Sequence, residues 1–341
     1  MDKFVFIVNP AGRDGRSLKR WKSVETILNE TEIELEVYFT EYVGHASEIA
    51  YSLRERIDID CVVACGGDGT VHEVASGLRT SDKKLGIIPA GTGNDIARAH
   101  NISLKNSKQI VDILINGVDR HVGAFRLQGT PAPSVDNYPE PRNNTKWDGE
   151  PDIDGRVVRW VFLESDCGVT SATSRAKLKR GKWIKGSMKY TYLGITEILP
   201  WKKKMAWVKI DEEEGIVVDF SMLAITTTEM FGGGYKVCPG ASPIVDHGQL
   251  CHAWGLSKIK MLLLMGPLKK GKHIGKWGIE QKSCKRLEIK SIDENGNPSE
   301  SPHSPSLFVQ ADGEPCMQTP VLLEYHVKQL WIRGASEVPW D

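Results

Sequence analysis

The hydrophobic pattern of the first 120 residues alternates short apolar runs with segments of helical periodicity. The runs are rich in β-branched residues and end at Gly, Pro or Asn, which predicts strands at Phe4–Val8, Ile33–Phe39, Cys61–Ala64 and Leu85–Ile88. Between and after them, helical spacing predicts helices at Ser17–Leu28, Ala46–Arg54, Thr70–Leu78, Asp95–His100 and Ser107–Ile115. Such alternation predicts an α/β domain over residues 1–122, a parallel sheet with helices on both faces. Ligands bind these sheets beyond the carboxyl ends of the strands.

The pattern changes from Val118 onward. Residues 128–157 are polar, with six acids against three bases, which predicts a surface insertion. Beyond it, short strand-like runs are separated by turns: Val157–Leu163, Ala206–Ile210, Ile216–Thr226, Leu287–Ile292, Leu307–Gln310 and Val321–Tyr325. These runs predict a β-rich, β-sandwich-like second domain over 123–330, interrupted by one helix at Ser187–Ile198. We expect the tail, 331–341, to pack back on the first domain.

Composition narrows the class of protein. The chain has 341 residues, enough for about two domains. Its 44 Lys and Arg balance 44 Asp and Glu, so no overall field attracts nucleic acid. Seven cysteines without a CxxC pair or zinc spacing predict reduced thiols. With no apolar run near the roughly 20 residues of a bilayer span and no signal peptide pattern, we expect a cytoplasmic, peripherally membrane-associated protein.

Three glycine-rich loops follow three strands of the first domain. They are Asn9–Ser17, Cys65–Thr70 and Pro89–Asp95. Glycine lets backbone N–H groups approach an anion, and the next helix presents its positive end to it, so the loops together predict a polyphosphate site. Each loop alone could equally be a capped strand-to-helix turn. The absence of GxxxxGK[ST] and of GxGxxG after the first strand disfavours a Walker-type or dinucleotide site.

These loops carry a family resemblance. Asn9-Pro10 with Gly12 and Gly15, Gly66-Gly-Asp-Gly-Thr70, and Gly91-Thr-Gly-Asn-Asp95 with Ala97-Arg98 resemble the catalytic-domain family of diacylglycerol, sphingosine, ceramide and bacterial lipid kinases. The resemblance continues in the second half, in the blocks Phe231–Ser242, Asp246–Leu250 and Ala311–Glu314.

The resemblance implies a two-domain kinase in which ATP and a lipid hydroxyl meet between the domains, with Mg²⁺ as the metal. It implies these nucleotide-binding residues: Asn9, Pro10, Arg13, Gly15, Arg16, Thr40, Gly66, Gly67, Gly69, Thr70, Gly91, Thr92, Gly93 and Asn94. Thr40 begins a short Thr…His-Ala block after the second predicted strand.

The candidate catalytic acids are Asp68, Asp312 and Glu314. Phosphoryl transfer needs neutralised phosphate charge, an in-line hydroxyl and a base for its proton. Asp68 could hold Mg²⁺ or polarise the hydroxyl, and the choice of base between Asp68 and Asp312 stays open. Asp312-Gly-Glu alone also fits a hairpin turn.

The resemblance also implies a Mg²⁺ site at Asp246, Gly248 and Leu250, largely through carbonyl groups. The family's turn reads Asp-Asp-Gly, whereas this chain has Asp246-His247-Gly248, a thin ligand set for a hard cation. Ser165 stands where the family often has Asn.

Two basic stretches carry interleaved aromatic residues. Residues 177–209 hold ten Lys or Arg against the one acid Glu197, with Trp183, Trp201 and Trp207. Residues 257–277 hold six lysines around Met261–Met265, and Trp277. Such stretches fit an anionic membrane surface or, equally, a solvated lysine face over an ordinary core. No nucleic-acid partner is expected.

The sequence therefore predicts an ATP-dependent lipid kinase that phosphorylates a sphingoid long-chain base or diacylglycerol, without separating the two. One alternative is an NAD kinase-like small-molecule kinase, because those enzymes share the Gly-Gly-Asp-Gly-Thr motif. The other is a non-catalytic protein that binds nucleotide or membrane. Oligomeric state and the role of the insertion are not predicted.

Overall fold

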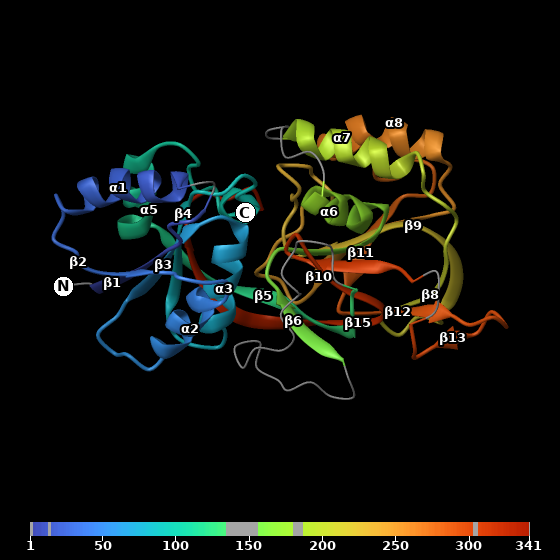
Figure 1. The fold of residues 1–341 in the computed structure, drawn as a ribbon, viewed down its shortest axis with the longest axis horizontal. Coiled ribbons are helices and arrows are strands. Elements are labelled where there is room, and N and C mark those ends of the chain that lie inside the picture. Colours follow the sequence, from blue (N-terminus) through green and yellow to red (C-terminus); the bar gives the residue numbers. More distant parts are fainter. Residues whose placement is uncertain (1–2, 13–14, 134–155, 180–186, 303–305, 341) are drawn as a thin grey trace. The chain divides into compact units, whose positions relative to one another are not determined.

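The computed structural model describes residues 3–12, 15–133, 156–179, 187–302 and 306–340, which fall into two compact units (Figure 1). Unit 1 contains Met1–Gly123 and Val327–Asp341, and unit 2 contains Ala124–His326. Most of the predicted insertion, residues 134–155, lies outside the described residues. Within the described ranges, no helix is long and apolar enough to cross a bilayer.

Unit 1 is built on a parallel sheet. Its strands are β1 (Lys3–Val8), β2 (Glu34–Phe39), β3 (Cys61–Gly66), β4 (Lys84–Pro89) and the end of β15 (Glu314–Gly334). They lie in the order β2-β1-β3-β4-β15, and all four pairings are parallel. β3 is buried along its whole length. The continuous apolar runs arise because both faces of a parallel sheet are covered.

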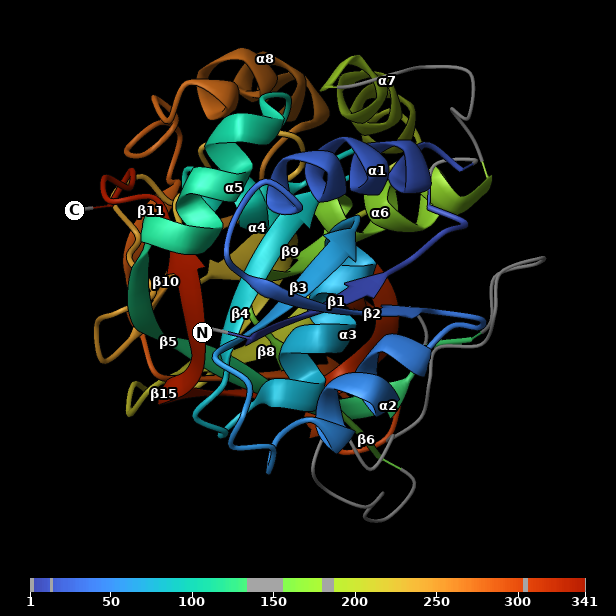
Figure 2. The same cartoon turned by 90° about the vertical axis from the view of Figure 1, so that its left-hand side faces the viewer.

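Helices cover both faces of this sheet. They are α1 (Arg16–Leu28), α2 (His45–Ser52), α3 (Asp68–Leu78), α4 (Asp95–Ala99) and α5 (Ser107–Asn116). Figure 2 shows α1 and α5 on one face, and α2 and α3 on the other. α1 buries Trp21, Val24 and Leu28 at helical spacing, and the Trp21 ring lies 4.9 Å from the Phe6 ring. The predicted α/β fold is confirmed.

Unit 2 is β-rich, as predicted. Its strands are the remainder of β5 (Val118–Pro131) and of β15, with β6 (Val157–Val161), β7 (Glu164–Gly168), β8 (Met205–Ile210), β9 (Ile216–Thr226), β10 (Gly248–Trp254), β11 (Glu280–Cys284), β12 (Arg286–Ile292), β13 (Pro298–Ser299) and β14 (Phe308–Ala311). Six strands close a circuit of antiparallel pairs, β8-β9-β7-β14-β15-β12 and back to β8. Burial alternates along β8 and β12 because one face meets the core.

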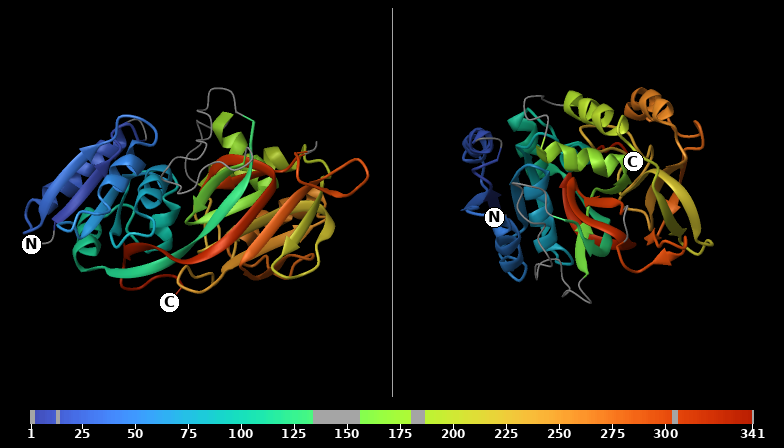
Figure 3. Two further views of the ribbon diagram at one scale, coloured as in Figure 1. Left: turned by 90° about the horizontal axis from the view of Figure 1, so that it is seen from below. Right: turned by 45° about the vertical axis from the view of Figure 1, so that its right-hand side comes forward.

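Three helices belong to unit 2: α6 (Val169–Lys179), α7 (Ser187–Ile198) and α8 (Lys258–Lys269). They lie on one side of its strands, as the right panel of Figure 3 shows. The prediction of a single helix was therefore wrong. α7 has the predicted bounds, but α6 has few large apolar residues, and α8 has apolar residues on every side, so neither shows an amphipathic period.

The end of β15 returns to unit 1 and is held there by Arg333. Trp331 and Ile332 pair with Lys84 and Leu85 of β4. The Arg333 guanidinium donates to both carboxylate oxygens of Asp119, at 2.7 and 2.9 Å, and its Nη1 lies 3.0 Å from Asp60 Oδ2. Arg333 is buried, and its pKa is raised, chiefly by the Asp119 hydrogen bonds.

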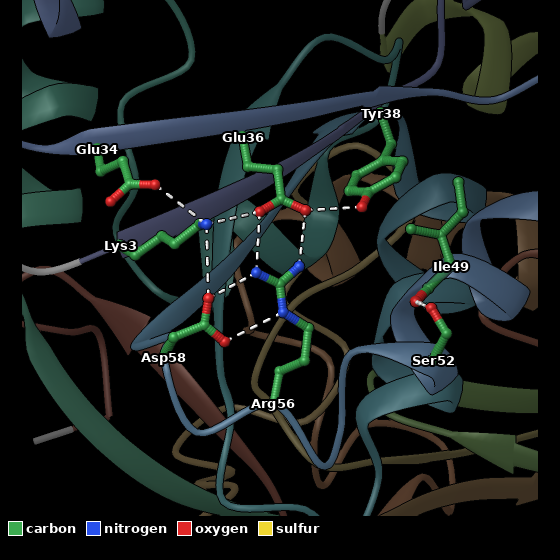
Figure 4. Close-up of polar contacts among 8 residues, drawn as sticks. All are labelled: Lys3, Glu34, Glu36, Tyr38, Ile49, Ser52, Arg56 and Asp58. Carbon is green, nitrogen blue, oxygen red and sulfur yellow. Dashed lines mark hydrogen bonds and ion pairs between the residues drawn. The ribbon is translucent and has the colours of Figure 1, made fainter.

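An exposed ion network closes the amino-terminal end of the sheet (Figure 4). Arg56 donates to both carboxylate oxygens of Glu36, at 2.7 and 3.0 Å, and also to Asp58. Lys3 pairs with the same two acids and with Glu34. The Arg56 hydrogen bonds lower the pKa of Glu36 to about 2.

Removing the Arg333 side chain tests its part in holding the C-terminal segment. Arg333→Met leaves Asp119 and Asp60 without their shared buried cation, so we expect the free energy of unfolding to fall by about 3 kcal/mol. Urea titration measures the change. Lys22→Met, at an exposed position of α1, is the control and should stay within about 0.5 kcal/mol of the wild type. Equal stability of the two variants would contradict the assignment.

The Glu36 network gives a pH dependence of stability. Because folding lowers the pKa of Glu36, its contribution is fully present above its unfolded pKa of about 4.3 and is lost as pH falls towards 2. We expect the difference in Tm between wild type and Glu36→Gln to be largest above pH 5 and to shrink towards pH 2. Calorimetry across this range measures it, with Glu32→Gln as an exposed control. A difference independent of pH would exclude this titration.

Candidate active site

The predicted nucleotide-binding residues gather at one edge of unit 1. Because β1 to β4 are parallel, their carboxyl ends meet there. Asn9 and Pro10 follow β1, Thr40 follows β2, Gly66 ends β3, and Gly67, Gly69 and Thr70 open α3; Gly91, Thr92, Gly93 and Asn94 follow β4, and Gly15 and Arg16 begin α1. Arg13 lies outside the described residues. The roles of these residues in nucleotide binding stay predictions.

Asn9 joins the first loop to the second. Its Nδ2 donates to Thr70 Oγ1 at 3.0 Å, and its Oδ1 accepts the N–H of Ala11 at 3.1 Å. Its own N–H donates to the Cys65 carbonyl at 3.0 Å. Beside it, the Thr40 N–H donates to the Val8 carbonyl at 2.9 Å, which holds the end of β2 against β1. One asparagine thus fixes the loop after β1 to the first turn of α3.

Asp68 joins the second loop to the third. Its Oδ2 accepts the N–H of Asn94 at 2.8 Å, and its Oδ1 accepts the N–H of Asp95 at 2.7 Å. These donors stand at the start of α4, so the Asp68 carboxylate caps that helix from another segment. A Cβ added to Gly93 would lie 2.7 Å from Asp68 Oδ2, so only glycine fits beside it.

The second and third loops also touch through their glycines. A Cβ on Gly91 would lie 2.4 Å from the Cα of Gly67. Asn94, in the left-handed region at φ 54°, closes the third loop on itself: Oδ1 accepts the Gly91 N–H at 2.7 Å, and Nδ2 donates to the Gly91 carbonyl at 3.0 Å. The contact requires glycine at position 91 independently of any ligand, and it leaves little room for a Cβ at Gly67.

The first turn of α3 is the part of this edge suited to an anion. The N–H groups of Gly91, Asn94 and Asp95 already donate within the protein. A helix leaves the N–H groups of its first turn without intrahelical acceptors, and its dipole favours negative charge there. The backbone from Gly67 to Thr70 therefore fits a phosphate group.

The second acidic centre lies in unit 2, at the hairpin between β14 and β15. Asp312 and Gly313 both have positive φ, 47° and 84°, as a type I′ hairpin turn requires. The Asp312 carboxylate is buried and accepts three backbone N–H groups, from Phe162, Leu163 and Glu164, at 2.9 to 3.0 Å. Asp312 therefore holds the turn between β6 and β7 in place.

Glu314 differs from the other two predicted acids. It opens β15, two residues after Asp312, and is partly exposed. Among the described residues, its carboxylate has no hydrogen bond or ion pair, whereas both oxygens of Asp68 and of Asp312 accept backbone N–H groups. Glu314 can therefore accept a proton without breaking an internal hydrogen bond.

Sequence reasoning missed a buried polar cluster beside Asp312. The Gln310 amide donates to Glu164 and, at 2.8 Å, to Asp166 Oδ2, and its carbonyl oxygen accepts the Gly313 N–H. Burial raises the pKa of Asp166 well above its usual range, so its neutral form persists at higher pH. The two acids in the strand-like block Phe162–Gly168 were the sequence feature that could have indicated this cluster.

The residues of the predicted metal turn do not fit Mg²⁺. The Asp246 carboxylate lies at the surface, where it accepts from Lys285 Nζ at 2.5 Å and contacts His247 Nδ1 at 2.9 Å. The Lys285 hydrogen bond lowers its pKa to about 2. Gly248 and Leu250 lie within β10, between β9 and β11. No metal-binding group of three or more His, Cys, Asp or Glu side chains occurs in the part of the chain described.

The capping role of Asp68 can be tested without an activity assay. Asp68→Asn keeps one acceptor oxygen where two backbone N–H groups need one each, so α4 should loosen. We expect amide hydrogen exchange over residues 89–98 to quicken and the free energy of unfolding to fall by about 2 kcal/mol. Asp112→Asn, which alters an exposed acid bonded to Asn116 on α5, is the matched control. Unchanged exchange in Asp68→Asn would refute the cap.

Comparisons with known proteins agree with this geometry. Residues 3–127 match the model of the diacylglycerol kinase catalytic domain, and residues 166–332 match the YegS C-terminal NAD kinase beta sandwich-like domain. A diacylglycerol kinase of Mycobacterium tuberculosis is 26% identical over 255 residues, covering 75% of this chain and 70% of that protein. Human sphingosine kinase 1 is 35% identical over 107 residues, 29% of this chain and 28% of that protein.

The fold is also found among solved structures. The crystal structure of a diacylglycerol kinase from Bacillus anthracis superposes with a TM-score of 0.64, at 14% sequence identity, over 99% of this chain and 98% of that one. The two matched domains together span most of the sequence and contain the glycine loops and the Asp312 hairpin. The chain therefore belongs to the diacylglycerol kinase catalytic-domain family.

Proposed function

We propose that this lipid kinase transfers the γ-phosphoryl group of ATP to the hydroxyl of a sphingoid long-chain base or of diacylglycerol. The observation that carries the proposal is the joined pair of glycine loops, held by Asp68 at the carboxyl edge of the unit 1 sheet. Relatives named for diacylglycerol and for sphingosine both support a lipid acceptor. Of the two predicted acids in unit 2, Glu314 would act on the hydroxyl and Asp312 would position the chain around it.

The ATP phosphates would be held by the backbone from Gly67 to Thr70. Neutral N–H donors and a helix dipole bind a phosphate without needing a Lys of the Walker type. ATP supplies the phosphoryl group, and the Mg²⁺ that accompanies it neutralises part of the phosphate charge. The contribution of the chain is to hold the phosphates in line with the hydroxyl, which requires rigid loops.

The proposal assigns different roles to the three acids. Asp68 and Asp312 are positioning residues, because their oxygens already accept backbone N–H groups from α4 and from the β6–β7 turn. Glu314 is the general base, because its carboxylate is unengaged among the described residues and it opens β15, two residues after Asp312. The proposal therefore assigns the base to Glu314, although the sequence had left the choice between Asp68 and Asp312.

The acceptor is identified by phosphate transfer from γ-labelled ATP with Mg²⁺ into mixed micelles. The panel holds diacylglycerol, sphingosine, phytosphingosine, ceramide and phosphatidylglycerol, with NAD as a water-soluble acceptor. We expect label in diacylglycerol or in the sphingoid bases, and none in NAD. Label in NAD alone would favour the small-molecule kinase. Bound ATP without transfer to any acceptor would favour a non-catalytic protein.

The base assignment predicts a difference in pH profile between two variants. Glu314→Gln should lower kcat at least about 100-fold with an unchanged Tm, and should remove the acidic limb of the kcat profile. Asp312→Asn should lower kcat and Tm together, because three N–H groups lose a charged acceptor, while the limb remains. Glu294→Gln, at an exposed position of unit 2, should match the wild type. An intact acidic limb in Glu314→Gln would overturn the assignment.

A further inference from the structure

The helix α8 is apolar on two opposite faces. Its buried face carries Met261 and Leu264. On the opposite face, Ile259 and Leu263 are one helical turn apart, with 71% and 59% of their surfaces exposed. A helix that is apolar all round normally lies within a core or a membrane. In unit 2 the outer face of α8 lies at the surface instead.

The sequence segment that contains α8 carries lysines and no acidic residues. No Asp or Glu occurs from His247 to Ile279, and the stretch holds six lysines: Lys258, Lys260, Lys269, Lys270, Lys272 and Lys276. All six are exposed, and so are Ile274 and Trp277 in the segment after the helix. Exposed aliphatic side chains near lysines and an aromatic ring fit the surface of an anionic membrane. Its headgroups are negatively charged and its interior is apolar.

The neighbouring helix α7 extends the face and holds it rigid. Its Tyr192 and Ile195 are also exposed. α7 packs directly on α8, where a Cβ on Gly194 would lie 2.8 Å from the Met265 methyl. Lys258 Nζ donates to the Leu199 carbonyl just after α7, at 2.7 Å. Figure 1 shows the two helices side by side, and α6 packs against α7.

Trp201 and Trp207 of the first basic stretch pack within unit 2 instead of on this face. Trp201 packs against the core of unit 2, with Lys204 Nζ 5.4 Å from its ring centroid. Trp207 lies on β8, where a Cβ on Gly215 would collide with its ring. Trp183 lies outside the described residues. The proposed face therefore rests on the aliphatic residues of α8 and on Trp277, and not on Trp201 or Trp207.

We propose that the outer face of α8, Ile259 and Leu263 with the surrounding lysines, docks on an anionic lipid bilayer. The inference rests on the proposed lipid kinase function in one respect: a lipid acceptor is presented at such a surface. Charge complementarity selects the bilayer over a second copy of this chain, because two such faces would bring lysines against lysines.

α7 and the turn after α8 contact the glycine-rich block Phe231–Ser242, which resembles the kinase family. Thr191 of α7 shares a 2.7 Å hydrogen bond with the Tyr235 hydroxyl. After α8, Gly271 packs on Pro239, where an added Cβ would lie 3.0 Å from the proline Cγ. The segment from Phe231 to Ser242 is therefore attached to both helices of the docking layer.

The test is co-sedimentation with vesicles of phosphatidylcholine alone and with about 30% phosphatidylglycerol. We expect the wild type to bind only the anionic vesicles. Ile259→Ser with Leu263→Ser should weaken binding at least tenfold, and Lys269→Glu with Lys270→Glu should weaken it about fivefold for each charge. Ile216→Ser with Val217→Ser, exposed residues of β9 in the same unit, is the matched control and should bind as the wild type.

A labelled variant gives a second measurement. All seven cysteines are buried, so Leu263→Cys can be labelled selectively with an environment-sensitive thiol fluorophore. We expect its emission to shift to the blue with anionic vesicles and to stay unchanged with phosphatidylcholine alone. Wild-type affinity of the Ile259/Leu263 variant, or an unshifted label on bound protein, would overturn the docking face. So would a concentration-dependent dimer that this variant abolishes without any vesicle binding.

The two proposals fail in different ways. If the docking face is right, the Ile259/Leu263 variant should keep wild-type kcat on an acceptor dispersed in detergent micelles and lose activity only on vesicles. Vesicle binding by a protein that phosphorylates no lipid would leave the docking face standing and refute the proposed reaction. Activity on vesicles that is unaffected by the variant would refute the docking face alone.

Discussion

The arrangement of the candidate nucleotide site depends on one carboxylate. Asp68 stands at the start of α3 and accepts the N–H groups that open α4, from a residue 26 positions away in sequence. The second and third loops are already joined by the backbone bond from Ala90 to Gly66, and Asp68 adds the bonds that fix the start of α4 against them. The acid of the Gly-Gly-Asp-Gly-Thr motif is thus first a structural anion. The proposed phosphate site is the first turn of α3, which Asp68 opens.

Unit 2 uses the same device. Asp312 accepts three backbone N–H groups from the β6–β7 turn, just as Asp68 accepts those of α4. A carboxylate engaged in this way gains stability from charge-assisted hydrogen bonds, but accepting a proton would weaken every one of them. Each unit therefore fixes a loop with one acid. Glu314, two residues after Asp312, has no such bonds to lose among the described residues, which is why the proposal gives it the substrate proton.

The hydrophobic pattern of the sequence was enough to predict most elements of unit 1. Its central parallel strands are buried on both faces, so each of them is a continuous apolar run. The glycine loops were also found locally, through their position at strand ends. The partners of Asp68 and Asp312 could not be predicted, since they are backbone groups brought together only by the fold. The same holds for the buried pair Glu164 and Asp166, whose meeting with Gln310 requires β7 and β14 to be neighbours. Sequence reasoning therefore identified the acids, but it could not show which of them are bound to backbone N–H groups in the fold.

The failure to predict α8 has an informative cause. Helix prediction relies on a contrast between an apolar face and a polar face, and this contrast exists because most helices meet protein on one side and water on the other. α8 lacks the contrast, since Ile259 and Leu263 lie opposite Met261 and Leu264. A helix that meets protein on one side and hydrocarbon on the other would have this pattern, with its polar groups at the margins. Lys258, Lys260 and Lys269 lie on those margins of α8, so the missing periodicity and the proposed docking face have one physical origin.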